Sequence, residues 1–417
     1  MPKHMKLGAF LMPTGHHVAA WRHPDAAADM GLNVDQYIRV AQTAEKAGFD
    51  LVFLEDAAGL RDENARTASQ TSRSVGFEPL SLLAAIAAQT SRIGLVATAS
   101  TSYNEPYALA RAFATLDLLS GGRAGWNLVT SASEIEAANF GAEGLRKHVD
   151  RYHRAGEFAK IVAQLWDPAD RSAPLNHTGE HFIVEQGLGL SPSRQGKPVM
   201  VQAGASDVGR DLAARTADVV FTAAQTLDSA KSFYDDVKAR TRAAGRNPDH
   251  LKIMPGVSPV VAATREEAQA KLDTLQSLIP DEVGLSLLAS YLATDALKDL
   301  PLDGPMPELQ ATQGMQSRQQ LVVEQARRDN LSIREVARHF AGARGHWRLV
   351  GTAEDIADEL EAWFTGGACD GFNVMPAFFP GELDSFVALV VPELQRRGLF
   401  RRAYEGETLR DNLGLNA

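Results

Sequence analysis

The sequence contains a single cysteine, Cys369, among 417 residues, which excludes a disulfide framework and a cysteine-based metal knuckle. It has no run of about 18 apolar residues, so it predicts no transmembrane helix. Residues 1–13 lack the basic start, apolar stretch and cleavage site of a secretory signal. Basic residues are also few, since 42 Lys and Arg accompany 52 Asp and Glu. We therefore expect a cytoplasmic protein with no membrane or nucleic-acid partner.

Short apolar runs alternate along the chain with longer stretches of helical periodicity, a pattern typical of βαβ units. Eight of these runs predict strands, and helical patterns follow them. The predicted strands are 7–12, 51–54, 93–97, 124–129, 199–202, 219–221, 253–257 and 371–375. The predicted helices are 34–47, 80–89, 108–119, 152–165, 208–215, 229–243, 265–275, 353–364 and 382–396. Eight such units predict an α/β fold, a (β/α)₈ TIM barrel that occupies residues 1–417 as one domain.

The chain is about 150 residues longer than a minimal barrel of roughly 250 residues. Two insertions account for the excess, at about 167–197 and about 279–346. Long insertions on a barrel commonly form lids or substrate walls. We expect the second insertion, which precedes the eighth strand, to be a lid with residues 316–318 and His346 as polar contacts, although a structural role fits each of these equally well.

Polar residues follow most of the predicted strands, where a barrel carries its chemistry. They are Thr14, His16, His17 and His23 after the first strand, Glu55 and Asp56 after the second, Thr98 to Asn104 after the third, Asn127 after the fourth, Gly204 to Ser206 after the fifth, and Thr222 and Gln225 after the sixth. Such a rim suits a ligand with many heteroatoms, for example a flavin or a nucleotide. Each residue alone also fits a turn or a helix cap.

Two patterns are suited to phosphate. Gly204, Ala205 and Ser206 let the backbone approach a ligand just before a helix start, where free N–H groups and the helix dipole favour an anion. His148 and Tyr152 stand four residues apart and share one face of a predicted helix. The structural alternatives are an N-cap at Ser206 and a packing or solvated surface for the His–Tyr pair.

Several catalytic motifs are absent. The chain has no G-x-G-x-x-G fingerprint, P-loop or H-E-x-x-H motif, and no histidine pair backed by a carboxylate at metal-ligand spacing. It also lacks the G-x-S-x-G elbow of α/β-hydrolases. We therefore expect no resident NAD-binding Rossmann domain and no metal site.

Longer motifs resemble a known family. They are Thr-Gly-His-His-Val-Ala-Ala-Trp-Arg-His-Pro at 14–24, the segments 98–103, 116–131 and 201–206, Gln-Ser-Arg at 316–318, Gly-Phe-Asn-Val-Met-Pro at 371–376 and Val-Pro-Glu-Leu-Gln-Arg-Arg-Gly-Leu-Phe at 391–400. On these motifs the chain resembles the bacterial luciferase-like flavin-dependent monooxygenases over essentially its whole length. Within that family it is most similar to the subgroup of nitrilotriacetate monooxygenase, pristinamycin synthase and dibenzothiophene-sulfone monooxygenase.

The resemblance implies a barrel that binds FMN non-covalently as a co-substrate, with reduced FMN supplied by a separate NAD(P)H:flavin reductase. Reduced FMN and O₂ would form a flavin (hydro)peroxide that transfers one oxygen atom to a small organic substrate, often with cleavage of a C–S or C–N bond. The family also implies a homodimer or homotetramer. Two alternatives stay open: a deazaflavin- or flavin-dependent dehydrogenase or reductase on the same barrel, and a non-catalytic flavin-binding protein.

The resemblance also implies roles for individual residues. Asp56 matches an acid that hydrogen-bonds near the flavin ring, while Thr98 and Asn127 match residues beside it. The pair His148 and Tyr152 matches residues that reach the phosphate and ribityl chain. The segment Gly204, Ala205 and Ser206 matches the helix start that receives the phosphate.

The sequence departs from the family where Glu55 replaces the usual alanine, which adds a charge near the ring. It also departs in the shorter stretch before residue 177 and at residues 187–190, where a substrate wall is expected.

Three histidines are candidates for the substrate side. With pKa values near 6.5, His17 and His23 after the first strand can hydrogen-bond the reacting oxygen or move a proton, and His346 belongs to the predicted lid. The alternative for His17 is a surface-loop histidine.

Overall fold

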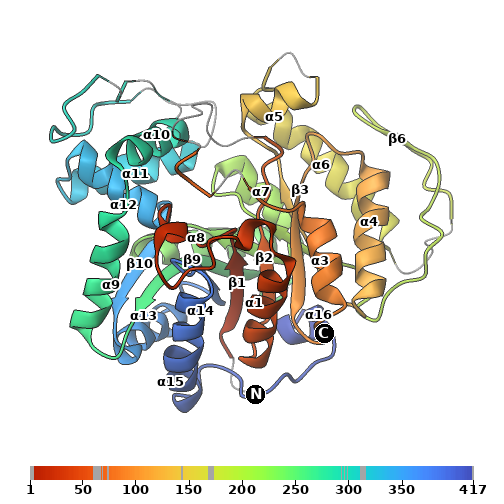
Figure 1. Ribbon diagram of the computed structural model, residues 1–417. Helices are drawn as coiled ribbons and strands as arrows, with labels where there is room; N and C mark the ends of the chain where they lie inside the picture. Colours follow the sequence, from red (N-terminus) through yellow and green to blue (C-terminus); the bar gives the residue numbers. More distant parts are fainter. Residues whose placement is uncertain are drawn as a thin grey trace.

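The structure is a computed structural model that describes residues 4–59, 67, 69–72, 75–141, 144–167, 173–292, 294, 296–297, 299–309 and 316–415. Eight parallel strands form a closed ring in the order β11-β1-β2-β3-β4-β7-β8-β9, and β9 pairs again with β11 (Figure 1). Their bounds are β1 (Lys6–Leu11), β2 (Leu51–Leu54), β3 (Gly94–Ser100), β4 (Ala124–Val129), β7 (Val199–Gln202), β8 (Val219–Thr222), β9 (Lys252–Val261) and β11 (Gly371–Val374). All eight predicted strands lie in this ring, which confirms the predicted barrel.

Three further strands were not predicted. β10 (Trp347–Gly351) pairs with residues 257–261 of β9, of which Val257 also pairs with β11. β5 (His177–Thr178) and β6 (Ile183–Val184) form a short antiparallel hairpin within the first insertion. The prediction ended the seventh strand at residue 257, whereas β9 continues through Pro259, which lacks an N–H donor.

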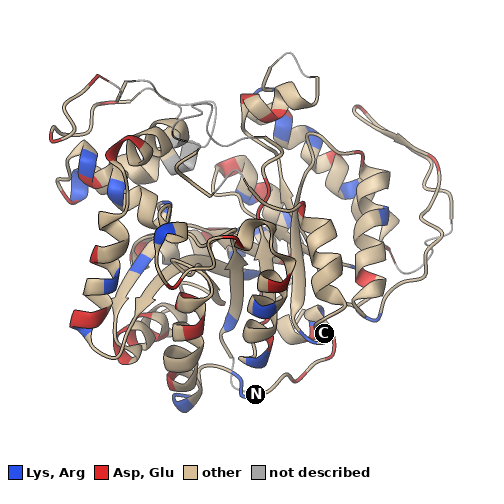
Figure 2. Ribbon diagram, viewed as in Figure 1, with Lys and Arg blue, Asp and Glu red and all other residues tan. Residues whose placement is uncertain are grey.

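Helices surround the ring and fill the second insertion. They are α1 (Val34–Lys46), α3 (Pro79–Ala87), α4 (Pro106–Leu119), α5 (Glu134–Asn139), α6 (His148–Leu165), α7 (Asp207–Thr216), α8 (Leu227–Ala243), α9 (Arg265–Ser277), α10 (Asp281–Leu292), α11 (Gln316–Arg328), α12 (Ile333–Ala343), α13 (Ala353–Thr365), α14 (Gly381–Ser385), α15 (Val391–Arg396) and α16 (Leu409–Leu413). Short 3₁₀ turns lie at Ala20–Arg22, Met30–Leu32 and Pro248–His250, and a π-helical turn at Phe386–Val390 joins α14 to α15. Figure 2 shows acidic and basic positions interspersed on the outer helices.

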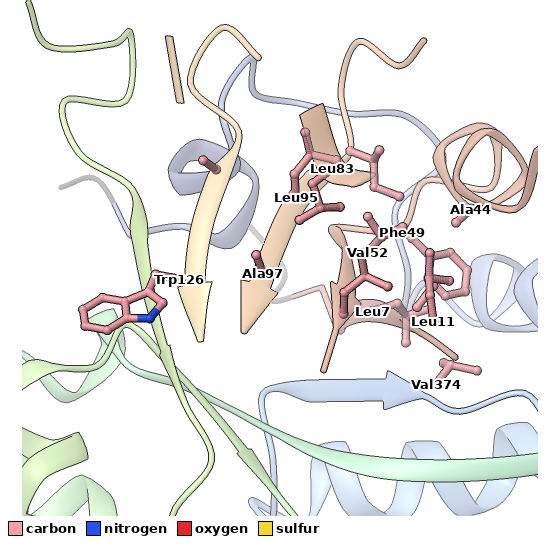
Figure 3. Packing of buried hydrophobic residues seen from close by; sticks show 14 of the residues in the cluster. Leu7, Leu11, Ala44, Phe49, Val52, Leu83, Leu95, Ala97, Trp126 and Val374 are labelled. Carbon is pink, nitrogen blue, oxygen red and sulfur yellow. The ribbon is translucent and has the colours of Figure 1, made fainter. Parts of the chain in front are cut away.

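The strands separate two apolar layers because alternate side chains point to opposite faces. Outward residues such as Val52, Leu95 and Trp126 pack beneath the surrounding helices (Figure 3). Inward residues such as Phe53 and Val96 fill the ring itself. The strands are buried on both faces, as in parallel barrels generally, so their sequences are nearly continuous apolar runs.

The C-terminal helix closes the end of the ring at which the strands begin. Leu409 and Leu413 of α16, with Leu415, cluster with the inward residues. A Cβ atom added to Gly94, the first residue of β3, would lie 2.4 Å from a methyl of Leu409. Both chain ends lie at this side in Figure 1, and α5 and α10–α12 lie at the opposite side. The mouth at the carboxyl ends of the strands is therefore the one available for a site.

Helices α10–α12 form a cap with an apolar cluster of its own. Leu288, Val336 and Phe340 are among its buried members. The cap also packs onto the loop after β1, where Val18 and Val283 belong to one apolar cluster. This arrangement places the second insertion over the β1 side of the mouth. Among the described residues, no helix is long and apolar enough to span a bilayer.

Candidate active site

Three phenylalanines form the floor of the mouth. Phe10, Phe53 and Phe221 come from β1, β2 and β8, and their ring centroids lie 4.7 to 5.7 Å apart. Two histidines contact this floor. His16 packs edge-on against Phe10 at 4.5 Å, and His346 stacks on Phe221 at 5.2 Å. The floor is apolar and closed, so any ligand must lie above it.

Thr98 and Asn127 lie opposite each other on β3 and β4 and face into the barrel. The Asn127 amide donates to the Thr98 hydroxyl at 2.8 Å. Asn127 is buried, and its carbonyl oxygen has no hydrogen-bond partner among the described residues. A buried acceptor left unsatisfied is costly, so this oxygen is suited to an N–H donor on a ligand.

His148 and Tyr152 lie together on the first turns of α6, with ring centroids 4.9 Å apart. The Tyr152 hydroxyl reaches the start of α7, since Cβ atoms added to Gly204 and Gly209 would lie 3.5 and 3.2 Å from it. The structure therefore brings together the two predicted phosphate-binding patterns, which come from segments more than 50 residues apart.

The start of α7 has the features of an anion site. The Ser206 hydroxyl caps the helix by accepting the N–H of Gly209 at 3.3 Å, so its N-cap role is also present. Gly204 is buried, and Ala205 and Ser206 are partly exposed. Burial and the neighbouring Arg151 lower the pKa of His148, so its imidazole is mainly neutral at pH 7. A bound phosphate would favour the protonated form.

His17 is buried in the loop after β1. Its Nδ1 accepts the N–H of Ala19 at 3.2 Å, and a Cβ added to Gly342 of α12 would lie 3.4 Å from its ring. His17 thus sits beneath the C-terminal end of the cap, which differs from the exposed loop position of the alternative interpretation.

His23 has a different environment. Its ring stacks on Phe378 at 4.1 Å, and its Nδ1 accepts the N–H of Asp25 at 3.2 Å. Burial lowers the pKa of His23, against a smaller effect of Asp25. Phe378 belongs to an apolar cluster separate from the floor. These contacts give His23 a packing role beside the loop after β11, and its predicted part in the reaction stays a prediction.

The two acidic side chains after β2 lie in different surroundings. Glu55 continues the inward series of Phe53, and it binds Arg344 through both carboxylate oxygens at 2.8 and 3.0 Å. Asp56 is exposed. Arg344 lies just beyond α12, and its guanidinium also reaches the Sδ atom of Met12 at 3.7 Å. The extra charge expected from Glu55 is therefore paired with Arg344, the residue that follows the last helix of the cap.

Sequence reasoning missed Arg344 and the three phenylalanines of the floor. The alternation of inward and outward positions was a usable signal for Phe10, Phe53 and Phe221, because each stands on the inward face of a predicted strand. No such alternation points to Arg344, which lies outside any predicted strand. Its backbone is in the left-handed region (φ 55°) just after a helix. Of the predicted lid contacts, His346 lies against the floor, and the side chains of residues 316–318 lie outside the described part of the structure.

A cluster of potential metal ligands lies elsewhere. Ligand atoms of His153, Glu180 and His181 come within 4.8 Å of one another on the surface of α6 and the β5–β6 turn. Sequence spacing does not reveal this grouping, because His153 is far from the other two along the chain. That the chain holds no metal stays a prediction.

Comparison with known proteins identifies the family. A model of luciferase-like monooxygenases matches residues 9–369. The chain is 47% identical to N-acetyl-S-(2-succino)cysteine monooxygenase of Bacillus subtilis (strain 168), over 99% of this chain and 97% of that protein. It is 45% identical to nitrilotriacetate monooxygenase component A of Aminobacter aminovorans, again over 99% and 97%.

A solved structure agrees with the sequence relatives. Riboflavin lyase with modified FMN and its substrate riboflavin superposes with a TM-score of 0.88 at 31% identity, over 99% of this chain and 96% of that one. These matches confirm the resemblance drawn from the motifs, and the chain belongs to the luciferase-like monooxygenase family.

Proposed function

We propose that this chain is the oxygenase component of a two-component, FMN-dependent monooxygenase. It takes reduced FMN from a separate NAD(P)H:flavin reductase, uses O₂ as co-substrate and adds one oxygen atom to a small organic molecule. The observation that carries the proposal is the joint presence, at one barrel mouth, of an anion cradle between α6 and α7 and a buried amide on β4 with an unsatisfied acceptor.

The anion cradle fits the phosphate of FMN. Glycines at 204 and 209 leave space beside the Tyr152 hydroxyl that side chains would fill. The free N–H groups at the start of α7 and its dipole favour an anion. Tyr152 and His148 would donate to the phosphate from the other side. Together these groups would hold the negatively charged end of the nucleotide.

The inner groups fit an isoalloxazine ring. The Asn127 carbonyl oxygen can accept an N–H from the ring edge, while its amide remains bonded to Thr98. The floor of Phe10, Phe53 and Phe221 offers an apolar surface beneath. Reduced FMN, when bound, supplies the two electrons needed to activate O₂. Asp56 is exposed, and its predicted contact near the ring remains part of this proposal.

The loops and the cap would exclude water from the barrel mouth. The phenylalanine floor closes the barrel below, and α12 lies over the loop that carries His17. Within this enclosure His17 and His346 carry imidazole rings, a side-chain type that can hold or move a proton in catalysis. We propose that these two histidines face the reacting substrate.

The substrate is proposed to lose a C–S or C–N bond. The relatives' names specify N-acetyl-S-(2-succino)cysteine and nitrilotriacetate, which are small organic acids with a carbon–sulfur or carbon–nitrogen bond next to carboxylate-bearing carbons. Their identity to this chain extends over its full length, which supports the same reaction class here.

Anaerobic titration with FMN, followed by flavin fluorescence and absorbance, tests the proposal. We expect the chain to bind reduced FMN, and Tyr152→Phe to weaken binding about tenfold to a hundredfold, because a hydrogen bond to a charged group contributes about 1.5–3 kcal/mol. His153→Ala is the matched control, since His153 is the exposed next residue of α6. Absence of FMN binding in both redox states would refute the proposal, and binding of a deazaflavin alone would favour the dehydrogenase alternative.

Coupling of FMN oxidation to product tests the histidines. With an unrelated flavin reductase supplying reduced FMN, His17→Ala and His346→Ala are expected to raise hydrogen peroxide release at the expense of product. His23→Ala is the control, since its ring packs on Phe378. Unchanged coupling in a variant would remove that histidine from the reacting groups.

A further inference from the structure

A polar cavity lies on a face of α6 next to the face that carries His148 and Tyr152. It has a volume of about 370 Å³ and is bounded by the segment after β3, the end of α5 and the first two turns of α6. Three of its lining side chains are arginines, namely Arg146, Arg151 and Arg154. His148 and Tyr152, which form the cradle with α7, do not line it.

Arg151 is the central residue of this cavity. It is 3% exposed, and its Nε atom has no hydrogen-bond partner among the described residues. One of its terminal nitrogens donates to the backbone carbonyl of Arg146, so the guanidinium is held in place. A buried, fixed guanidinium with an unsatisfied N–H can donate a hydrogen bond to an acceptor on a ligand.

The positive charge of the cavity is offset only in part within the described residues, where Glu134 raises the pKa of Arg151, and Glu105 and Glu157 raise that of Arg154. None of the three arginines forms an ion pair there, although Glu105 also lines the cavity. Burial lowers the pKa of Arg151 and of Arg154, and the charge of Arg146 lowers that of Arg154 further. Burial still lowers the pKa of Arg151 and Arg154 overall, so an anionic ligand would stabilise their charged forms.

The cavity also has a surface for the organic part of a ligand. Tyr103 and Phe140 line it and stack on each other at 4.7 Å with nearly parallel rings. Figure 2 shows basic positions on the segment that leads into α6. The combination of fixed guanidinium groups and aromatic faces is typical of sites that bind small organic anions.

From these observations we infer that the cavity formed by Arg146, Arg151 and Arg154 is a binding site for the carboxylate or phosphate group of a small molecule, separate from the FMN cradle. The ligand's oxyanion would accept from the Nε of Arg151 and from the flanking guanidinium groups. The inference does not require the proposed monooxygenase activity, since it rests on groups that the flavin site does not use.

Isothermal titration calorimetry on the full chain, with citrate in one series and inorganic phosphate in another, tests the inference. Binding of citrate alone would identify a carboxylate site, and binding of phosphate alone a phosphate site. Arg146→Ala is expected to weaken binding about tenfold, because it removes one charge-assisted contact at an exposed position. Arg151→Gln is expected to weaken it further, and Arg151→Lys to recover little, since lysine lacks the planar fork.

Lys147→Ala is the matched control, because Lys147 is an exposed cation next to Arg146 that does not line the cavity. Its affinity should stay within about twofold of the parent chain. The same titrations are repeated with saturating FMN, and FMN affinity is measured for each arginine variant. Unchanged anion binding with FMN present, and unchanged FMN affinity in Arg146→Ala, would support a separate site.

Three results would overturn the inference: no binding of either anion, equal loss in Lys147→Ala and Arg146→Ala, or displacement of the anion by FMN. Failure of FMN binding alone would contradict the proposed function and leave this result intact. If Arg151→Gln does not fold, as shown by its circular dichroism, Arg146→Ala still decides the question.

Discussion

Glu55 and Arg344 form an ion pair across the barrel mouth, and neutralising one partner is expected to cost more than replacing both. Two unit charges about 4 Å apart attract each other by about 4 kcal/mol at an effective dielectric constant of about 20. The Arg344 side chain is 6% exposed and that of Glu55 is 19% exposed, so both have lost much of their hydration. Desolvation therefore offsets most of the attraction.

Glu55→Gln removes the carboxylate that binds the buried Arg344 guanidinium at 2.8 Å. We expect it to lower the free energy of unfolding by about 3 kcal/mol, the lower end of the range for buried pairs, because Glu55 keeps some contact with water. The double variant Glu55→Gln/Arg344→Met removes both charges and is expected to lie within about 1 kcal/mol of the parent chain.

Urea denaturation followed by tryptophan fluorescence measures the free energy of unfolding of Glu55→Gln, Arg344→Met and the double variant. Glu407→Gln is the control, since Arg194 and Glu407 pair at 2.7 Å with side chains 72% and 65% exposed. An exposed pair contributes about 0–1 kcal/mol. The reasoning is wrong if Glu55→Gln costs no more than Glu407→Gln, or if the double variant costs the sum of its two single changes.

Three more predictions concern stability. Burial, assisted by Arg348, lowers the pKa of His339 to about 4. As the pH drops from about 6.5 to about 4, the unfolded chain therefore binds a proton before the folded chain does, and stability should fall. His339→Gln should flatten that part of a profile of melting temperature against pH, and an unchanged slope would show that His339 does not cause the fall. Leu409→Ala should lower the free energy of unfolding in urea by about 2–5 kcal/mol, against under about 0.5 for the exposed Leu119→Ala. Gly94→Ala should cost about 1–3 kcal/mol by contact with Leu409, and less in the Leu409→Ala background; strictly additive costs would show that the two residues do not touch.

The ring strands could be predicted because a parallel barrel buries both faces of each strand, so each appears as an apolar run. β10 could not, since Trp347–Gly351 includes Arg348 and pairs with residues 257–261 of β9, most of which lie beyond those that close the ring. Its partner is a stretch around Pro259, a residue that argues against a strand in sequence. Local patterns therefore predicted the ring, and the extension depended on a tertiary pairing.

The candidate site likewise combines local features that can be predicted from sequence with contacts that depend on tertiary packing. The four-residue spacing of His148 and Tyr152, and the small residues before α7, are local features that the sequence displays. Their mutual contact arises from the packing of α6 against α7, which periodicity does not reveal. Arg344 is a further case, because a left-handed position favours glycine, and its partner Glu55 is 289 residues away. The resemblance to a family supplied roles for the residues that match its motifs, but it gave no partner for Glu55, where the sequence departs from the family.

Backbone hydrogen bonds connect the loops of the mouth to one another. The N–H groups of His16 and His17 donate to carbonyls of Pro376 and Ala377 in the loop after β11, and that of Val18 donates to Ala341 of α12, each at 3.0 Å. The loop that carries His17 is therefore bonded to the barrel on one side and to the cap on the other. Any movement of α12 away from the mouth must break the bond to Val18 or displace the loop. We therefore expect exclusion of water by the cap and placement of His17 over the site to occur together.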